Sequence, residues 1–214
     1  MEFESVDAAA VIDILLLLLI GIGPKIALVP FLDVTDGMPE TTKRRVVRKM
    51  LVTAAVAAVV LLVLGGLLTR LLHFSAGALG VSSGIILLII AITMVLGGSG
   101  EQQAGKLNGQ DPMRLAVFPL AVPYLLNPAG IVVLVTASAE AGTLGVYGIV
   151  LGALAVVIAL DAVVFRLAAR VGGHLNATNM LVTEKVFGFL LAALAVQLAL
   201  DGLADLGVIH LLHH

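Results

Sequence analysis

The chain consists largely of apolar runs that are each long enough to cross a lipid bilayer. A bilayer core about 30 Å thick needs about 20 consecutive apolar residues in a helix. The 214 residues leave room for six such spans with short loops between them. We place the spans at residues 8–32, 47–69, 77–98, 115–138, 143–168 and 186–207. The sequence therefore predicts an all-α polytopic membrane protein with six transmembrane helices.

The composition argues against several other classes of protein. Hydrophobic residues make up 60% of the chain and charged residues 12%, whereas soluble domains carry about 25% charged residues. A net charge of −2 argues against nucleic-acid binding, which is typical of strongly basic chains. The absence of cysteine excludes thiol catalysis and cysteine-bound metal. His210 and His214 lack the partners of a metal site. No nucleophile–base set or phosphate-binding loop occurs, so we expect no enzyme activity and no cofactor.

Basic residues gather on one side of the predicted spans. If the N-terminus lies outside, ten of the twelve lysines and arginines fall in cytoplasmic segments, Arg70 lies outside and Lys25 lies within the membrane. The positive-inside rule then predicts a multi-pass protein of the plasma membrane with both termini outside. The basic group at 43–49 mainly sets this topology, and contact with lipid headgroups is a secondary role.

The first span is interrupted near its centre by Gly21-Ile22-Gly23-Pro24-Lys25. Proline removes a backbone donor and clashes with the preceding turn, so a helix must kink or break here. Broken backbone at membrane depth is tolerated only where protein or a water-filled cavity covers it, and an intramembrane lysine indicates a functional site. The stretch predicts a solute site inside a helix bundle. The alternative is a packed helix that proline merely kinks.

The fourth span has a similar break, Asn127-Pro128-Ala129-Gly130. Pro24 and Pro128 stand 104 residues apart, and the same gap-free offset aligns spans two and three with spans five and six. Because each repeat has three spans, the second must lie upside down relative to the first. We predict a first repeat at 1–98, a cytoplasmic linker at 99–114, an inverted second repeat at 115–207 and a tail at 208–214.

The two breaks together predict a binding site at the membrane midplane. Each proline would begin a second half-helix, and the N-terminal ends of such half-helices carry unpaired amides and partial positive charge. Ends of this kind bind carboxylates and other anions, and glycine beside them allows a ligand close to the backbone. The predicted substrate-binding residues are Gly23, Pro24, Lys25, Asn127, Pro128, Gly130, Thr93 and Gln197.

Polar side chains elsewhere in the spans extend this hypothesis. Lys25 and Asp161 lie at similar predicted depth, and a buried charge is costly unless it is paired. We therefore predict a salt bridge between them, direct or through water, that acts as a gate, as a proton-coupling pair or only as a structural bridge. Thr93 and Gln197 are equivalent under the offset, and they form interhelical hydrogen bonds or contact the solute.

Glycines four residues apart mark helix faces that can pack closely. Gly80 with Gly84 and Gly148 with Gly152 have this spacing. Such faces mediate helix contact more often than function. We expect them to pack against other helices, within the chain or in a homodimer.

Several stretches carry a resemblance to a known family. The fourth span reads Ala116-Val-Phe-Pro-Leu-Ala-Val-Pro-Tyr-Leu-Leu-Asn-Pro-Ala-Gly-Ile, and the sixth reads Gly188-Phe-Leu-Leu-Ala-Ala-Leu-Ala-Val-Gln197. With the break in the first span, they resemble the MarC family of six-span bacterial and archaeal membrane proteins, over residues 15–203. Some members are described as small neutral amino acid transporters, so the resemblance implies movement of a small solute with a carboxylate. Lys25 departs from the family pattern, where a small residue follows Asn-Pro, and would change the charge of the pocket.

Three functions stay open at this point. The leading hypothesis is a transporter or exporter of a small neutral amino acid or related carboxylate metabolite, by alternating access between the repeats. The second is an ion transporter of related fold, for a divalent cation or coupled to protons; Asp161 alone supplies a carboxylate near the middle of a span, whereas hard cations need several oxygen ligands. The third is a membrane scaffold without transport. The expected partners are a small-molecule substrate and membrane lipid.

Overall fold

Helices make up nearly all of the computed structural model, which describes residues 8–96, 111–140, 144–171 and 177–209. Four helices are long and apolar enough to span a membrane: α3 (Glu40–Leu72), α4 (Ala76–Leu96), α8 (Leu144–Val171) and α9 (Ala177–Asp205). The shorter elements are α1 (Ala8–Gly21), α2 (Pro24–Val34), α6 (Pro112–Leu115), η1 (Ala116–Leu125) and α7 (Pro128–Glu140). The all-helical membrane architecture predicted from the sequence is confirmed.

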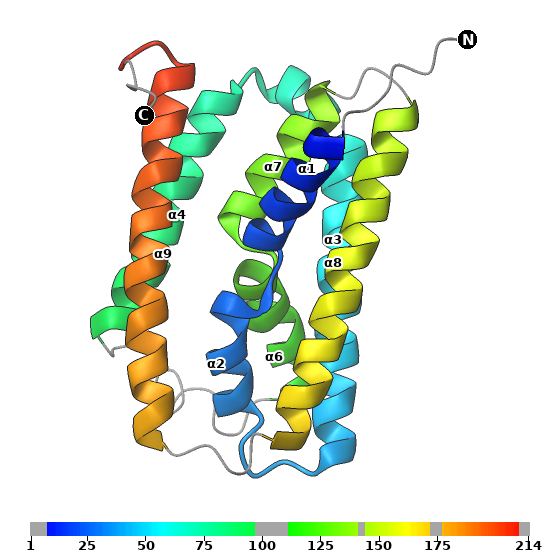
Figure 1. The fold of residues 1–214 in the computed structure, drawn as a ribbon, viewed down its shortest axis with the longest axis vertical. Helices are drawn as coiled ribbons and strands as arrows, with labels where there is room; N and C mark the ends of the chain where they lie inside the picture. Colours follow the sequence, from blue (N-terminus) through cyan, green and yellow to red (C-terminus); the bar gives the residue numbers. More distant parts are fainter. Residues whose placement is uncertain (1–7, 97–110, 141–143, 172–176, 210–214) are drawn as a thin grey trace.

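The first and fourth predicted spans are both broken. α1 ends at Gly21 and α2 begins at Pro24, and the two helices follow one another from one end of the bundle to the other (Figure 1). α7 begins at Pro128 after the irregular segment η1. Within η1, Phe118 and Val122 have extended backbone angles, and each precedes a cis-proline. Both predicted breaks are therefore present, and the fourth span has further breaks at Phe118 and Val122.

Two helices begin earlier than the sequence predicts. α3 starts at Glu40, directly after Pro39, so the basic group at 43–49 forms the first turns of the helix itself. α6 starts at Pro112, inside the predicted linker, where Asp111 caps it by accepting a hydrogen bond from the Met113 amide at 3.0 Å. The rest of that linker and residues 210–214 of the tail, which include His210 and His214, lie outside the described residues. The predicted domain boundaries stay predictions.

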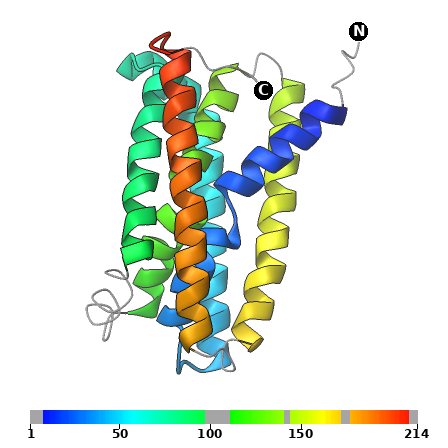
Figure 2. The same ribbon diagram turned by 60° about the vertical axis from the view of Figure 1, so that its left-hand side comes forward.

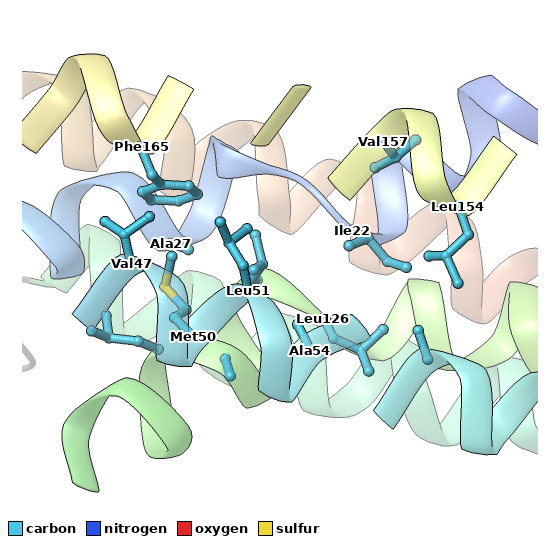
Figure 3. Packing of buried hydrophobic residues seen from close by; sticks show 14 of the residues in the cluster. Ile22, Ala27, Val47, Met50, Leu51, Ala54, Leu126, Leu154, Val157 and Phe165 are labelled. Carbon is cyan, nitrogen blue, oxygen red and sulfur yellow. The ribbon is translucent and has the colours of Figure 1, made fainter. Parts of the chain in front are cut away.

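The main core lies between α3 and α8, around the broken helices. Figure 3 shows Ile22 from the first break close to Leu154 and Val157 of α8, with Leu126 from the second break nearby. All four side chains are buried in one apolar cluster. Because lipid tails are as apolar as these side chains, the cluster is held by close van der Waals packing more than by exclusion of water.

α4 and α9 form a separate pair that packs along almost its whole length (Figures 1 and 2). Glycines line the contact: a Cβ atom on Gly84 would lie 2.7 Å from the Ala195 carbonyl oxygen, and one on Gly202 would lie 2.6 Å from the Gly77 carbonyl oxygen. These distances are too short for any side chain, so the glycines let the two backbones approach.

The two glycine pairs singled out in the sequence have different surroundings. Gly80 and Gly84 pack against α9, which confirms the expected helix contact and leaves that face covered within the chain. Gly148 and Gly152 are exposed on α8, with nothing within 4 Å of a Cβ atom at either position. A homodimer through a glycine-lined face stays a prediction for the α8 face alone.

A lysine links α9 to the end of α4. The Lys185 ammonium group donates a hydrogen bond to the Val95 carbonyl oxygen at 2.7 Å, one of the last carbonyls of α4, which have no partner within their own helix. We expect Lys185→Met to lower the free energy of unfolding by about 1–2 kcal/mol, because the variant loses a charge-assisted bond at a helix C-terminus. Thermal unfolding in detergent measures this. Lys49→Met, which removes an exposed lysine from α3, is the matched control and should leave the midpoint unchanged.

Candidate functional site

The two breaks lie against each other midway along the bundle (Figure 1). Ile22 and Leu126 form an isolated antiparallel β-bridge. The Gly23 amide donates to the Leu125 carbonyl at 3.2 Å, and the Asn127 amide donates to the Gly21 carbonyl at 3.0 Å. Non-helical backbone inside a membrane needs its polar groups paired. Here the two breaks supply partners to each other.

Asn127 holds the two breaks together with its side chain as well. Its amide nitrogen donates to the Ile20 carbonyl at 2.9 Å, and its side-chain oxygen accepts from the Gly130 amide at 3.1 Å. The second bond caps the N-terminus of α7, a position where asparagine is favoured. The residue is 2% exposed. Asn127 therefore fixes the start of α7 against the end of α1.

Asn127→Ala should lower the free energy of unfolding by about 2–3 kcal/mol, since it removes a helix cap and a buried hydrogen bond between the breaks. The comparison variant is Gln197→Ala, which removes an exposed side chain bonded only within its own helix and should cost less than about 0.5 kcal/mol. Thermal unfolding of both variants in the same detergent measures the difference. Equal midpoints would contradict the structural role assigned to Asn127.

Glycines at the breaks serve contact between backbones. A Cβ atom on Gly130 would overlap the backbone of Gly21, and a Cβ atom on Gly21 would overlap the backbone of Gly130. At Gly23 a Cβ atom would lie 2.6 Å from the Leu19 carbonyl oxygen. Protein backbone thus occupies the space beside Gly23 and Gly130 in which we predicted a ligand from the sequence. The contact between Gly21 and Gly130 was not predicted, although both glycines belong to the motifs that mark the breaks.

The N-terminal ends of the two second half-helices differ in their capping. α7 is capped by the side chain of Asn127, whereas α2 has Gly23 at the equivalent position and no side-chain cap. Pro24, the first residue of α2, has no amide hydrogen, so the amides of Lys25 and Ile26 form the open end. Of the two half-helix ends, that of α2 is therefore the better suited to an anion.

Asp161 lies on the buried face of α8 and is 0% exposed. Neither carboxylate oxygen has a hydrogen-bond partner among the described residues. Val157 and Phe165, one turn to either side, are buried in the main core. Phe165 also meets Phe31 of α2 edge to face, with ring centroids 5.3 Å apart.

The direct salt bridge predicted between Lys25 and Asp161 is wrong, because neither oxygen of Asp161 has a partner. Ile26 and Ala27 take the buried positions at the start of α2, which leaves Lys25 on the exposed side of that helix. A functional role for either residue stays a prediction.

Thr93 and Gln197 are not brought to the breaks. Both side chains are exposed. Thr93 donates to the Ile90 carbonyl at 2.7 Å, and Gln197 donates to the Asp201 carboxylate at 2.7 Å. The predicted interhelical hydrogen bonds are therefore wrong, because the glycine and alanine faces of α4 and α9 make the contact and turn these polar side chains outward.

Metal-ligating side chains do not gather anywhere in the part of the chain that the structure describes: no group of three or more histidine, aspartate or glutamate residues could hold an ion there. Cysteine is absent from the whole sequence. The chemistry available at the breaks is that of backbone amides and carbonyls, the Asn127 side chain and, one helix away, the Asp161 carboxylate.

Comparison with known proteins gives one family and two relatives. Residues 8–206 match the family described as MarC family integral membrane protein. The chain is 27% identical over 160 residues to UPF0056 membrane protein YvbG of Bacillus subtilis (strain 168), which covers 73% of this chain and 76% of that protein. It is 26% identical over 121 residues to UPF0056 membrane protein MJ1677 of Methanocaldococcus jannaschii, which covers 54% of this chain and 57% of that protein. No solved structure matches the chain.

Proposed function

We propose that this chain, which belongs to the MarC family of integral membrane proteins, transports or exports a small neutral amino acid or a related carboxylate metabolite. The observation that carries the proposal is the pairing of two broken helices midway along the bundle. Interrupted helices at corresponding places in two halves of a membrane protein are typical of transporters, whose solute site lies between them near the midplane. In this proposal the basic end of the bundle, which is the end where α3 begins with the basic group at 43–49, faces the cytoplasm.

The proposal includes six spans arranged as two inverted three-helix repeats. Ile22 and Leu126, which form the bridge, are 104 residues apart, the same offset that relates Pro24 to Pro128. The bond from Gly23 to Leu125 and the bond from Asn127 to Gly21 exchange with one another under this offset. Such an exchange is expected at a two-fold axis lying in the membrane plane.

Packing between the longer elements supports the same relation. α3 contacts η1 and α7, and α8 contacts their counterparts under the offset, α1 and α2. α4 contacts α7, and its counterpart α9 contacts α2. In this arrangement α1 with α2 forms one interrupted span, and η1 with α7 forms the other.

The substrate carboxylate is proposed to bind at the N-terminal end of α2. Gly23 provides no side chain to cap the amides of Lys25 and Ile26. An anion can therefore accept hydrogen bonds from these amides, in the role that the side-chain oxygen of Asn127 has at the start of α7. The described conformation is closed, since Ile22, Leu126 and Asn127 are buried. Binding therefore requires the breaks to separate on one side, as in alternating access.

The pair formed by α4 and α9 is the proposed moving part. Its buried side chains form a cluster separate from the main core, and that cluster includes Ile26 of α2. Movement of this pair would therefore act directly on the first turn of α2. Rocking of one bundle against another around a fixed site is a common means of alternating access.

Asp161 is the proposed coupling residue. Its carboxylate is buried without a partner, and a charged group in such a place costs several kcal/mol. A carboxyl group that is retained at this cost fits a residue that binds and releases a proton during the cycle. The same observation favours the second candidate function, a proton-coupled ion transporter.

Uptake of radiolabelled alanine, glycine and glutamate into proteoliposomes tests the proposal. We expect uptake of at least one of them above that of empty liposomes. Lys25→Ala should lower the ratio of glutamate to alanine uptake, because it removes a positive charge beside the site. Alanine is the residue at the equivalent position of the second repeat, Ala129. Arg70→Ala is the matched control at an exposed position far along α3 and should leave the ratio unchanged.

The possible outcomes separate the candidate functions. Proton-driven cation flux without amino acid uptake would favour the ion transporter. Absence of flux for every solute, with the protein folded and inserted, would leave the membrane scaffold. Asp161→Asn separates coupling from binding: amino acid transport that is still driven by a pH gradient in this variant would exclude a proton role for this carboxylate.

A further inference from the structure

A cleft at the basic end of the bundle is lined by four arginines from two helices that are far apart in the sequence. Arg44 and Arg48 come from α3, and Arg166 and Arg170 come from α8. The cleft has a volume of about 590 Å³, which is large enough for a phosphate group with its substituents. None of these arginines takes part in the pairing of the breaks.

The charges in this cleft are poorly balanced. Arg44 forms an ion pair with Glu40 at 3.3 Å, but the two side chains are 58% and 50% exposed, and exposed pairs of this kind are weak. No ion pair among the described residues involves the other three arginines of the cleft. Like charges that converge in one cleft repel each other unless an anion lies between them. The cleft is therefore suited to an anionic ligand.

Arginine is well matched to phosphate, because its planar group can donate two parallel hydrogen bonds to two oxygens. Arg44 and Arg48 are one helical turn apart on α3, and Arg166 and Arg170 are one turn apart on α8. Residues four apart lie on the same face of a helix. The two helices thus present two facing pairs of arginines, which could hold one phosphate diester from both sides.

The wall of the cleft continues into an apolar surface. Val47, Leu51 and Val52 complete the lining. Val52 is 53% exposed, and Val56, one turn further along α3, and Val163, three residues before Arg166 on α8, are also exposed. On both helices a charged end is therefore followed by exposed apolar side chains along the same face. This order matches a phospholipid, with its headgroup at the interface and its chains in the bilayer.

We propose that this cleft binds the headgroup of an anionic phospholipid, with the phosphate between the arginines of α3 and α8 and the acyl chains along Val52, Val56 and Val163. The proposal rests on the membrane location of the chain and does not depend on transport. It assigns these arginines a specific ligand in addition to their effect on topology. The lipid would also join α3 to α8, the two long helices that enclose the main core.

Native mass spectrometry of the purified protein in detergent tests this proposal, with dioleoyl phosphatidylglycerol and dioleoyl phosphatidylcholine as probes. We expect the wild-type protein to bind the anionic lipid about tenfold or more tightly than the zwitterionic one. The double variant Arg48→Gln/Arg166→Gln should lose most of this preference. Arg45→Gln/Lys49→Gln is the matched control, since it removes the same charge from exposed positions of α3 that do not line the cleft, and it should keep the preference.

The remaining outcomes each decide the matter. An equal loss in the control would overturn the proposal, because it would show diffuse attraction to the basic end. Displacement of the lipid by glycerol phosphate at equal concentration would also overturn it, because the site would then hold a soluble anion. If the double variant does not fold, Arg48→Lys/Arg166→Lys replaces it: a specific site should weaken although the charge is kept, and unchanged binding would contradict the bidentate arrangement.

Discussion

Gly130→Ala is expected to be, with Gly21→Ala, one of the two most damaging single-methyl changes among the described glycines, with a loss of about 3 kcal/mol or more in the free energy of unfolding. Overpacking usually costs about 1–3 kcal/mol, and the cost is highest where nothing can move aside. The added Cβ atom would overlap the backbone of Gly21, so no side chain can turn away. A helix gains only about 1 kcal/mol when alanine replaces glycine. The steric clash costs more than this gain, so the net effect of the substitution on the free energy of unfolding is a loss.

The measurement is the midpoint of thermal unfolding in detergent, together with the yield of folded protein. Gly148→Ala is the control, because this glycine is exposed on α8 with nothing within 4 Å of an added Cβ atom. The control should be neutral or slightly stabilised by helix propensity. If Gly130→Ala were as stable as the wild type, the two breaks would have to be apart in the major state of the protein.

Asp161→Leu is expected to stabilise the protein while it abolishes coupled transport. A buried polar group without a partner costs about 1–3 kcal/mol, and a charged one costs more. Leucine has the same branched shape, with two methyl groups in place of the two oxygens, and the neighbouring buried positions on α8, Val157 and Phe165, are apolar. The free energy of unfolding should therefore rise by about 1–3 kcal/mol.

Both properties can be measured on one preparation, by thermal unfolding in detergent and by uptake into proteoliposomes under a pH gradient. Asp201→Asn is the control, because Asp201 is exposed and bonded only to Gln197 of the same helix. It should change neither stability nor uptake. A lower unfolding midpoint for Asp161→Leu would show that the carboxylate has a partner that stabilises the folded state.

The breaks in the helices could be predicted because their cause is local. Proline at positions 24 and 128 lacks an amide hydrogen, and its ring clashes with the preceding turn of a continuous helix. Both prolines begin helices in the structure. The added irregularity at Phe118 and Val122 could have been suspected from Pro119 and Pro123, which follow them. The long membrane-spanning helices were predictable for a similar reason, since span length follows from bilayer thickness.

The positions of polar side chains around each helix axis could not be predicted in the same way. Counting residues gives the depth of Lys25 and Asp161 along their helices but does not give the rotation of either helix against its neighbours. That rotation depends on the packing of buried side chains from several elements, among them Phe31 and Phe165. Thr93 and Gln197 illustrate the same limit, because the glycine-lined contact between α4 and α9 determines which side faces outward.

The difference in capping between α2 and α7 has a consequence for the two sides of the membrane. Two identical inverted halves would present the same chemistry to the outside and to the cytoplasm, so neither direction of movement would be distinguished. In this chain Asn127 closes one half-helix end, whereas Gly23 leaves the matching end open. In the proposed inverted arrangement, a difference of one side chain therefore gives the centre of the protein an inner and an outer face.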